Sequence, residues 1–447
     1  MKKSEIVVIG GSAAGLTSAI TARRHYPDKK ITVIRKEEKA VIPCGIPYIF
    51  GTLDSPEKNI MGDDPYKKNN IELLIDEVLE IDREAKKITL KSGEEIGYEK
   101  LIIATGSLPM MPPIPGFEKE NVFPVYKSLP HLSKMLEVLK KSKRLVIIGG
   151  GFIGVEFADE CKKIEGLEVS IVEILPHCLQ IAFDPEFCEE AEKILEERGI
   201  KLCTGEKVVS IDGLKNVEWV KLESGRLLEA DVVIIGIGAV PNVELAKKAG
   251  LRLGPTGAIV VDRFMRTSDE NIFACGDCAE KVSFFGGRPS ALRLASIASA
   301  EARIAGANLY GNKREYIGTI GVFSTFVGDT AFAVAGLTEE NAKRQGYDVI
   351  TGTFEAPNRH PGAMPGMKPV KVKLIFERRT GALLGGIFMG DKAVGELVNA
   401  ICACIHYRMT IDDIASFQMG THPALTASPV VYPLVNAAEM ALLQAKK

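Results

Sequence analysis

Short apolar runs recur along the chain, and several of them lead directly into glycine-rich turns. In two stretches, "EIVVIGGSAAGLTSAITARR" (5–24) and "KRLVIIGGGFIGVEFADE" (143–160), a helical segment follows the turn. A strand of β-branched residues, a glycine turn and a helix together form the pattern of a dinucleotide-binding βαβ unit. The pattern therefore predicts an α/β protein with two Rossmann-like units about 140 residues apart.

The first glycine turn places Gly10, Ser12 and Gly15 at the three positions of G-x-G-x-x-G, with serine in the middle. The first glycine permits a tight turn and the last lets the helix approach the strand, so the helix N-terminus faces a pyrophosphate. The next predicted strand, "KITVIRKEEK" (30–39), ends at Arg35, where such units usually carry a ribose-binding carboxylate. Glu37 and Glu38 remain alternatives for that carboxylate.

The second turn fits the pattern fully, with Gly149, Gly151 and Gly154. The following predicted strand, "EVSIVE", ends at Glu173, 24 residues beyond Gly149 and close to the roughly 20 expected for a ribose-binding carboxylate. The same carboxylate would repel a 2′-phosphate. We therefore expect the second unit to prefer NADH over NADPH.

Composition narrows the class of protein. A length of 447 residues predicts two or three domains, and a net charge of −2 gives no reason to expect nucleic-acid binding. The N-terminus lacks the long apolar core of a signal peptide, and no apolar stretch approaches the ~18 residues of a membrane span. Nine irregularly spaced cysteines are typical of reduced thiols, so we expect a cytoplasmic protein without a disulfide framework or a metal site.

Two further motifs connect the chain to a known family. "YEKLIIATGSLP" (98–109) contains Ala104, Thr105 and Gly106, and "TSDENIFACGDCAE" (267–280) contains Gly276 and Asp277. Together with the paired glycine turns, and in the same order, they resemble the FAD-dependent pyridine nucleotide–disulfide oxidoreductases over essentially the whole chain. The resemblance implies FAD at the first unit and NADH at the second, with Asp277 bonding to the ribityl chain of the flavin.

The same motif contains Cys275 and Cys278, whose C-x-x-C spacing also occurs in thioredoxin-like centres and half zinc sites. We favour the flavin motif because no second ligand pair lies nearby in the sequence. The residues expected to contact the cofactors are Gly10, Ser12, Ala13, Gly15, Arg35, Ala104, Thr105, Gly106, Gly276, Asp277, Gly149, Gly151, Phe152, Gly154, Glu156, Glu173 and Gly238.

The resemblance also implies a domain order similar to that of glutathione reductase. An FAD-binding domain (1–115) would be interrupted by an NAD-binding domain (116–245) and would resume over 246–325. Residues 326–447 would form an α+β domain that makes a homodimer. The proline-rich "PMMPPIPG" (109–116) is typical of a connector between domains. We expect no fused sulfurtransferase domain.

A lone thiol, Cys44 in "AVIPCGIPYIFG" (40–51), is the candidate redox centre. Disulfide reductases with two active cysteines have C-x4-C or C-x2-C, but Ile49 and Pro47 occupy those two places here. "PCGIPY" instead resembles the single-cysteine branch, which includes coenzyme A-disulfide reductases, NADH oxidases and peroxidases, and persulfide or polysulfide reductases. The alternative is a small buried hydrophobic residue.

We expect Cys44 to open a helix, with its sulfur near the flavin. An ordinary thiol is only ~3% thiolate at pH 7, and a helix N-terminus raises that to roughly half, so a second activating group is needed. His422, in "GTHPALTASPVVYPLVNAAEMAL" (420–442), resembles the histidine that crosses the dimer interface in the family. Ala427 stands where the usual partner carboxylate would be, so a capping or interface role remains open, and His360 is a second candidate.

Departures from the narrower branches limit the predicted substrate. Peroxidases and water-forming oxidases usually have a histidine where this chain has Ala13, and coenzyme A-disulfide reductases have S-F-x-N-C where it has Ala40 and Pro43. The expected activity is therefore NAD(P)H-dependent reduction of a small persulfide, polysulfide or disulfide, including coenzyme A-linked ones. Phe152 would gate the nicotinamide or serve as core, and Glu156 would hold the nicotinamide side. An NADH oxidase and a non-enzymatic redox sensor are the alternatives.

Overall fold

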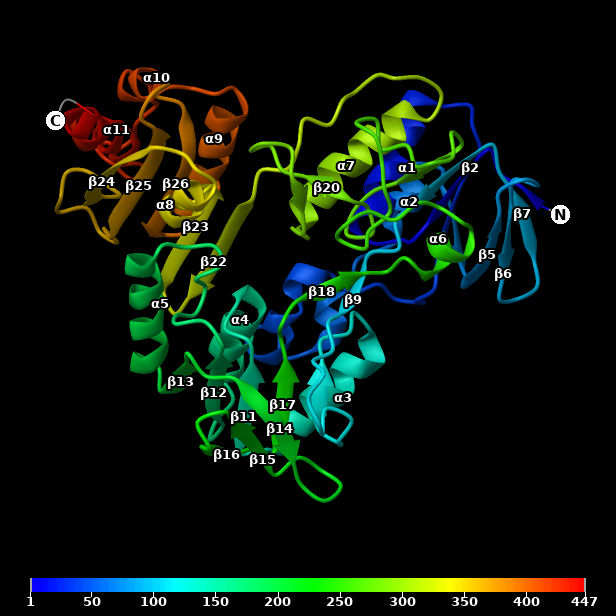
Figure 1. Ribbon diagram of the computed structural model, residues 1–447, viewed down its shortest axis with the longest axis horizontal. Helices are drawn as coiled ribbons and strands as arrows, with labels where there is room; N and C mark the ends of the chain where they lie inside the picture. Colours follow the sequence, from blue (N-terminus) through cyan, green and yellow to red (C-terminus); the bar gives the residue numbers. More distant parts are fainter. Residues whose placement is uncertain (1, 446–447) are drawn as a thin grey trace. The chain divides into compact units, whose positions relative to one another are not determined.

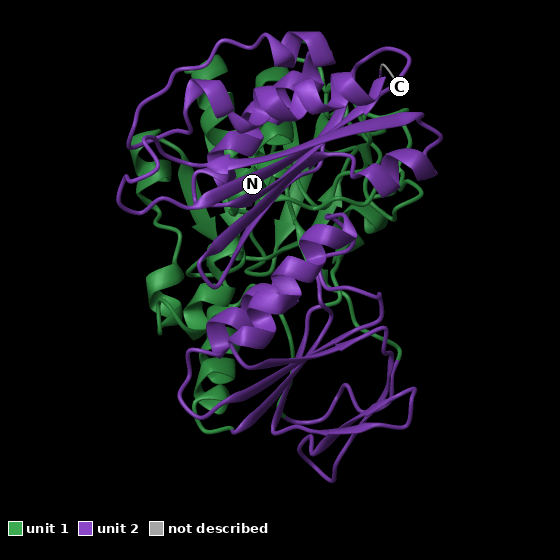
Figure 2. Ribbon diagram, turned by 90° about the vertical axis from the view of Figure 1, so that its left-hand side faces the viewer, with its two compact units in different colours: residues 1–113, 121–142, 237–319 green, residues 114–120, 143–236, 320–447 purple. Residues whose placement is uncertain are grey.

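The computed structural model describes residues 2–445. The chain forms two compact units, shown in green and purple in Figure 2. Unit 1 comprises residues 1–113, 121–142 and 237–319, and unit 2 comprises 114–120, 143–236 and 320–447. Within the described part of the chain, no helix has both the length and the apolarity needed to cross a membrane.

Unit 1 is built around a parallel five-stranded sheet with the order β19-β8-β2-β3-β4. Its strands are β19 (Ile272–Ala274), β8 (Lys100–Ile103), β2 (Ile6–Ile9), β3 (Ile31–Arg35) and β4 (Glu72–Ile75). Every residue of β2 and β3 is buried, as expected for strands covered on both faces. Helices α1 (Ala13–His25) and α7 (Ala295–Asn308) pack side by side (Figure 1).

The remainder of unit 1 surrounds this sheet with small elements. A second sheet has the order β1-β7-β6-β5, and two-stranded ribbons are formed by β9 with β18 and by β20 with β21. The remaining elements of unit 1 are β1 (Lys2–Lys3), β5 (Val78–Asp82), β6 (Lys87–Leu90), β7 (Glu95–Gly97), β9 (Ser107–Pro109), β10 (Val122–Pro124), β18 (Ala239–Pro241), β20 (Lys281–Val282), β21 (Pro289–Ser290), α2 (Asp64–Lys68), α3 (Leu129–Leu139), α6 (Glu244–Lys248), and the 3-10 helices η1 (Pro43–Gly45), η2 (Pro47–Phe50) and η3 (Pro56–Asn59).

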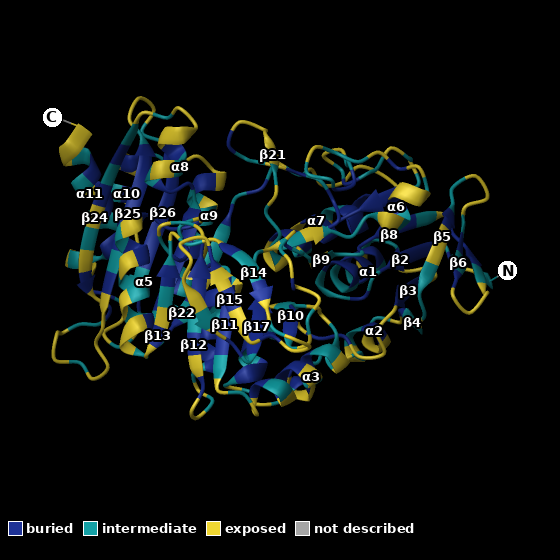
Figure 3. Cartoon of the chain, turned by 60° about the horizontal axis from the view of Figure 1, so that its bottom comes forward, coloured by how far each residue is buried: buried dark blue, intermediate teal, exposed yellow. Residues whose placement is uncertain are grey.

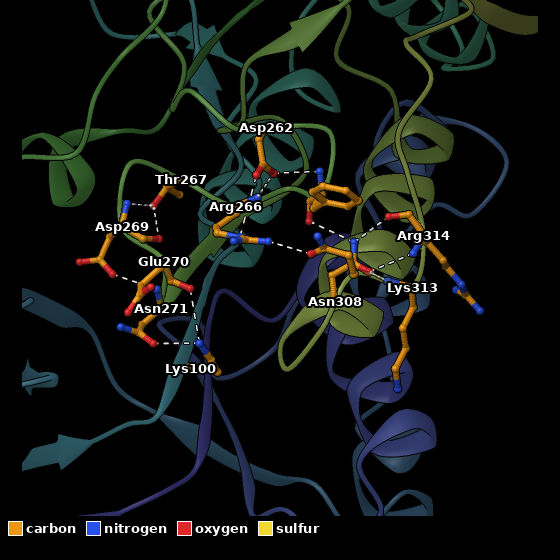
Figure 4. Close-up of polar contacts among 12 residues, drawn as sticks. Lys100, Asp262, Arg266, Thr267, Asp269, Glu270, Asn271, Asn308, Lys313 and Arg314 are labelled. Carbon is orange, nitrogen blue, oxygen red and sulfur yellow. Dashed lines mark hydrogen bonds and ion pairs between the residues drawn. The ribbon is translucent and has the colours of Figure 1, made fainter.

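A polar network fixes the segment that returns to the main sheet of unit 1 (Figure 4). The Asp262 carboxylate accepts the backbone N–H groups of Phe264 and Arg266, at 2.8 and 2.9 Å. The buried side chain of Asn308, at the end of α7, donates to the carbonyl oxygens of Phe264 and Arg314. Asp269 accepts the N–H of Asn271, immediately before β19, at 2.9 Å. Both ends of this returning segment are therefore held by side-chain hydrogen bonds.

Unit 2 contains the second dinucleotide-type sheet, with parallel strands in the order β17-β11-β12-β13. The predicted strand "EVSIVE" coincides with β12 (Glu168–Glu173). Figure 3 shows β11 and β17 largely in the colour of buried residues. The other elements of this part are β11 (Arg144–Ile148), β13 (Ile200–Thr204), β17 (Val232–Ile235), the antiparallel strands β14 (Val208–Asp212), β15 (Trp219–Leu222) and β16 (Leu227–Glu229), and the helices α4 (Phe152–Cys161) and α5 (Pro185–Glu197).

The C-terminal part of unit 2 is an antiparallel sheet with the order β22-β23-β26-β25-β24. Helix α9 packs on β23 and β26, and helix α11 packs on β24 and β25. The elements are β22 (Val322–Val327), β23 (Thr330–Gly336), β24 (Val349–Pro357), β25 (Pro369–Glu377), β26 (Leu383–Gly390), α8 (Glu339–Arg344), α9 (Val394–His406), α10 (Ile411–Ala415), the 3-10 helix η4 (Pro429–Val431) and α11 (Pro433–Ala445). The predicted α/β class with a C-terminal α+β domain is confirmed.

A partly buried ionic cluster in unit 2 links strand β25 to the helices α5 and α8. The ammonium group of Lys373, on β25, lies 2.9 Å from Asp184, 2.6 Å from Glu186 and 2.8 Å from Glu339. Lys373 and Asp184 are both buried, so removing either partner would leave an uncompensated charge. This cluster is one of the links between the C-terminal sheet and the helix α5 of the same compact unit.

Candidate functional site

The first glycine turn leaves the amide end of α1 open. The helix follows Ser12, whose side chain makes no capping hydrogen bond, and its first turn contains no acidic residue. Gly10 has φ +107°, and a Cβ there would lie 2.2 Å from the carbonyl oxygen of Ala104. A helix N-terminus without a side-chain cap binds anions through its free N–H groups. The turn beside Ala13 and Gly15 therefore fits a pyrophosphate.

The other two motifs of unit 1 lie against this helix end. Gly276 packs on the first turn of α1, where its added Cβ would come within 2.9 Å of the Ala14 Cβ. The next residue, Asp277, accepts a 2.7 Å hydrogen bond from the Ser107 hydroxyl, and Lys127 lies 3.6 Å from the same carboxylate oxygen. The structure thus brings the glycine turn, the Ala104–Gly106 stretch and Asp277 together, as the sequence predicted.

The stretch 104–106 is held from the other side by the ribbon β9-β18. The Thr105 hydroxyl donates to the carbonyl oxygen of Asn242 at 2.7 Å, and the N–H of Asn242 donates to the carbonyl oxygen of Gly106 at 2.9 Å. Gly238 accepts the N–H of Met110 at 3.0 Å. Gly238 therefore belongs to unit 1, and its cofactor contact stays a prediction.

Arg35 is committed to bonds within the protein. Its side chain is 1% exposed, and its guanidinium bonds to both carboxylate oxygens of Asp63, at 2.7 and 3.3 Å. It also donates to the carbonyl oxygens of Glu37 and Glu38, each at 2.7 Å, while both of their side chains are exposed. The carboxylate that stands beside the end of β3 is therefore Asp63, which the sequence did not indicate.

Cys44 is exposed and lies within the 3-10 turn η1. The predicted helix at Cys44 is wrong: the chain forms two 3-10 turns, η1 and η2, because Pro47 has no N–H to continue an α-helical ladder. Behind the thiol, the buried side chain of Asn59 donates to the carbonyl oxygen of Ile42 at 2.9 Å. A Cβ on Gly45 would lie 2.0 Å from the Asn59 amide oxygen, so glycine is required there. A three-residue 3-10 turn offers little helix dipole, so thiol activation must come from elsewhere.

The C-x-x-C pair has the properties of core residues. Cys275 and Cys278 are each 0% exposed, and burial raises the pKa of both thiols. All nine cysteines are thiols, and within residues 2–445 no cluster of His, Cys, Asp and Glu could hold a metal ion. The geometry supports the flavin motif over a thioredoxin-like centre, because buried protonated thiols exchange poorly.

The second glycine turn repeats the first in unit 2. Helix α4 follows Gly151, which has no side chain to cap it, and its first turn contains no acidic residue. Gly149 has φ +109°, and a Cβ on Gly154 would lie 1.8 Å from the Gly149 carbonyl oxygen. Glu173 ends β12 and accepts the N–H groups of Gly150 and, at 2.7 Å, of Leu175. The carboxylate is therefore fixed beside the turn, at the position expected for a ribose-binding group.

Two further predicted nicotinamide-side residues lie on α4. The Phe152 ring stacks on Phe323 at 5.1 Å with an interplanar angle of 5°, and Phe183 also contacts it, so it packs in an aromatic cluster. Glu156 accepts a 3.0 Å hydrogen bond from the hydroxyl of Thr325, on β22. Burial raises the pKa of Glu156 to about 7, although the Thr325 hydrogen bond acts in the opposite direction. Glu156 can therefore hold or release a proton near neutral pH.

Both candidate histidines lie in one loop cluster of unit 2. The Nδ1 atom of the exposed His422 accepts the N–H of Ala424 at 3.2 Å, so the neutral ring carries its proton on Nε2. His360 lies beside the same loop, where its Nδ1 is 3.2 Å from the Thr426 carbonyl oxygen and must donate to it. Thr426 also accepts the backbone N–H of His422 through its hydroxyl, at 3.0 Å. Backbone and hydroxyl groups thus orient His422, in place of the carboxylate that is missing at Ala427.

Sequence reasoning missed the side chains that support these motifs. Asn59, Asp63 and Lys127 in unit 1 and Thr325 in unit 2 each contact a predicted site residue or its turn. These side chains are brought in by tertiary packing and carry no motif.

Comparison with known proteins places these observations in a family. Residues 4–302 match the family model described as pyridine nucleotide-disulphide oxidoreductase, and residues 322–431 match the dimerisation domain of that family. The chain is 33% identical over 447 residues to an NADH oxidase of Methanocaldococcus jannaschii, covering 98% of both chains. It is 32% identical over 446 residues to an NAD(P)H coenzyme A polysulfide/persulfide reductase of Pyrococcus horikoshii, again covering 98% of both.

Solved structures give the same result for the fold. An NAD-dependent persulfide reductase from A. fulgidus matches with a TM-score of 0.92 at 32% identity, over 99% of this chain and 84% of that one. A water-forming NADH oxidase from Lactobacillus brevis, solved with NADH, matches with a TM-score of 0.89 at 28% identity, over 99% of both chains. The chain therefore belongs to the pyridine nucleotide-disulphide oxidoreductase family and is an oxidoreductase, which removes the non-enzymatic redox sensor from consideration.

Proposed function

We propose that the protein is an FAD-dependent NADH oxidoreductase that reduces persulfides, polysulfides or small disulfides through Cys44. The observation that carries the proposal is an exposed thiol in a 3-10 turn of the same unit as the first glycine turn. The family's paired-cysteine chemistry has no second cysteine here, because Pro47 and Ile49 fill both places. Relatives named as persulfide and coenzyme A-dependent sulfur reductases support this assignment.

The residues of unit 1 fit FAD. The open amide end of α1 would bind the pyrophosphate, and Asp277, oriented by Ser107 and Lys127, would accept hydrogen bonds from the ribityl hydroxyls. Asp63 would supply the carboxylate beside the adenosine ribose. When bound, FAD takes two electrons from NADH as a hydride and supplies them to the sulfur held at Cys44.

The residues of unit 2 fit NADH. The uncapped start of α4 would bind its pyrophosphate, and the fixed carboxylate of Glu173 would accept hydrogen bonds from the adenosine ribose. A 2′-phosphate would meet this carboxylate at close range, so we expect NADPH to be the poorer donor. Glu156 would hold the nicotinamide side, and Phe152 would gate it by leaving its stack on Phe323.

Cys44 would carry the sulfur chemistry. Its thiolate attacks the outer sulfur of R–S–SH, forming Cys44–S–SH and breaking the S–S bond of the substrate, so that a thiolate RS⁻ leaves. With a disulfide R–S–S–R, the same attack gives a Cys44–S–S–R mixed disulfide and RS⁻. Two electrons then cleave the new S–S bond, restoring the Cys44 thiolate and releasing HS⁻ or RS⁻. The leaving thiolate takes a proton from an acid nearby or from water.

His422 would be that acid, supplied from the second subunit of a homodimer. The N–H of Ala424 bonds to Nδ1, so Nε2 is the nitrogen that would carry the transferred proton; the protonated ring would release that proton to the thiolate, and the neutral ring would only donate a hydrogen bond to it. The matched dimerisation domain supports a homodimer, and large apolar side chains lie exposed within it, with Tyr407 78%, Leu425 71% and Val430 80% exposed. A cytoplasmic location, where thiols stay reduced, completes the proposal.

Substituting Cys44 by serine tests the proposal. Under strict anaerobiosis, NADH should still reduce the flavin of Cys44→Ser at the wild-type rate, but reduction of persulfide, polysulfide or coenzyme A disulfide should fall at least ~100-fold. Cys402→Ser is the matched control, because it removes a partly exposed thiol from α9 and should leave every rate unchanged. Sulfur reduction that survives in Cys44→Ser would overturn the assignment.

An NADH oxidase is the second candidate, supported by the relative from M. jannaschii and by the neighbour from L. brevis. Ala13 argues against a peroxidase or a water-forming oxidase, because the first turn lacks the histidine that those branches usually carry there. The two candidates differ in their acceptor. Oxygen consumption that is faster than sulfur reduction in wild type and is lost in Cys44→Ser would favour the oxidase.

A further inference from the structure

We propose that the buried ion pair of Lys281 and Glu301 positions the Gly276–Asp277 turn for FAD binding. The inference rests on the proposed FAD-dependent function and names two residues that no motif indicates. They are positioning residues, because they hold the backbone of the turn rather than the cofactor itself.

The pair holds both backbone groups of one residue. Glu301, on α7, accepts the N–H of Gly276 at 2.8 Å, and Lys281 donates to the carbonyl oxygen of Gly276 at 2.7 Å. The two charged groups lie 3.3 Å apart, and Lys281 also donates to the carbonyl oxygen of Ala279 at 3.0 Å. The Gly276 peptide groups are therefore clamped from two sides by one ion pair.

Both charges are buried, which is unusual unless they have a specific role. The side chains of Glu301 and Lys281 are 0% and 2% exposed. Burial raises the pKa of Glu301 to about 7, even with Lys281 beside it, so the pair is costly in the folded chain. A well-packed apolar pair would stabilise the core at least as well. An apolar pair could not, however, accept the N–H of Gly276 or donate to its carbonyl oxygen, as Glu301 and Lys281 do.

Gly276 is the point where a small displacement would affect FAD. Its φ of +80° and its contact with Ala14 set the path of the chain against the first turn of α1. Asp277 follows directly, and its carboxylate is oriented by Ser107. If the clamp were released, the N–H of Gly276 would lose its acceptor and its carbonyl oxygen would keep only the N–H of Ala279, at 3.0 Å, so we expect Asp277 to shift relative to the open amide end of α1.

The test measures FAD binding to the full chain after removal of its flavin. Glu301→Ala should weaken FAD binding about 10-fold to 100-fold, which corresponds to the loss of one hydrogen bond to a charged group. Glu301→Gln keeps an oxygen that accepts from Gly276, so it should recover most of that affinity. The visible absorption and circular dichroism of FAD bound at saturation should also change in Glu301→Ala and return in Glu301→Gln.

Asp269→Asn is the matched control. Asp269 also accepts one backbone N–H and pairs with one cation, Arg83 at 2.9 Å, but it holds the start of β19, whereas Glu301 holds the turn after its end. The control should lower thermal stability without changing FAD affinity or spectrum. If Glu301→Ala does not fold, Lys281→Met should weaken FAD binding about 10-fold instead.

The outcomes separate the two proposals. Variants at Glu301 and Lys281 that bind FAD as tightly as wild type, within twofold and with an unchanged spectrum, overturn the clamp alone. A wild-type chain that binds no FAD would overturn the proposed function itself. A loss of affinity equal to that of Asp269→Asn would reduce the pair to a structural role and would also reject the inference.

Discussion

The two glycine turns share one backbone design and differ where their second strand ends. In each, the glycine after the first motif glycine lies against that strand-end residue: a Cβ on Gly11 would come within 2.9 Å of Arg35, and one on Gly150 within 2.9 Å of the Glu173 Cβ. In unit 1 the strand-end residue is a buried cation, whereas in unit 2 it is a carboxylate.

The difference shows that the charge beside each glycine turn cannot be predicted from the strand-end residue alone. Arg35 is neutralised by Asp63 and by two backbone carbonyl oxygens, so the carboxylate at the end of this strand comes from another segment, at Asp63. The carboxylate of Glu173 is held in position by the backbone N–H groups of Gly150 and Leu175. We infer that both turns present a carboxylate, supplied directly in unit 2 and through an arginine in unit 1.

Arg35→Glu should have the largest effect. A second carboxylate would face Asp63 and the carbonyl oxygens of Glu37 and Glu38 at a buried position, which we expect to destabilise the chain by about 3–5 kcal/mol and to abolish FAD retention. Thermal unfolding and the flavin content of the purified chain measure this. Arg35→Lys keeps the charge but loses the forked contact, so it should retain FAD with a smaller loss of stability. Normal FAD content in Arg35→Glu would show that Asp63 does not need the arginine.

Glu173→Ala should affect only the second turn. Loss of the ribose acceptor should raise KM for NADH about 10-fold to 100-fold and reduce the preference for NADH over NADPH, because the repulsion of a 2′-phosphate disappears. FAD content should stay at the wild-type value. Glu168→Ala, at the exposed start of the same strand, is the control and should leave KM unchanged. An unchanged NADH preference in Glu173→Ala would contradict the assigned role.

The comparison also separates what the sequence could predict from what it could not. The glycine positions and Glu173 were predictable because strand, turn and helix are neighbours in sequence and their geometry follows from local backbone rules. Asp63 lies 28 residues from Arg35, and Thr325 lies 169 residues from Glu156. Such partners depend on tertiary packing, so no local pattern indicates them.

At Cys44 the prediction failed for a local reason, since the expected helix is incompatible with a nearby proline. The sequence around it was expected to open a helix, yet Pro47 limits it to 3-10 turns. The buried Asn59 instead supports the chain just before this turn, through its hydrogen bond to the carbonyl oxygen of Ile42. The identity of the candidate nucleophile was predictable from the motif, but its surroundings were not.

The two helices that follow the glycine turns differ in a titrating group, which gives a smaller, pH-dependent effect. Two residues after the last motif glycine, α4 carries Glu156 and α1 carries Thr17. Because burial raises the pKa of Glu156 from 4.5 to about 7, its contribution to stability is fully present below pH 4.5 and is lost as the pH rises through about 7. Between pH 5 and pH 8, the free energy of unfolding of Glu156→Gln should therefore fall by roughly 1–3 kcal/mol less than that of wild type.

Denaturant unfolding at several pH values measures how the free energy of unfolding changes with pH, that is, the slope of stability against pH. Glu165→Gln, an exposed carboxylate just beyond α4, should keep the wild-type slope. A Glu156→Gln slope equal to that of wild type would mean that Glu156 stays ionised throughout this range, as an exposed carboxylate does.

Thr325→Val should change stability the least, but it tests a single hydrogen bond to Glu156. The substitution preserves shape but removes the hydroxyl that donates to Glu156 at 3.0 Å, and this hydrogen bond stabilises the ionised carboxylate. Its loss, about 1 kcal/mol, should raise the pKa of Glu156 further by up to about one unit, so the stability loss moves to higher pH. Thr325→Ser keeps the donor and should restore the wild-type midpoint. If the stability of the valine, serine and wild-type chains is lost at the same midpoint pH, burial alone sets the protonation of Glu156. The hydroxyl of Thr325, on β22, would then have no effect on the group beside the second turn.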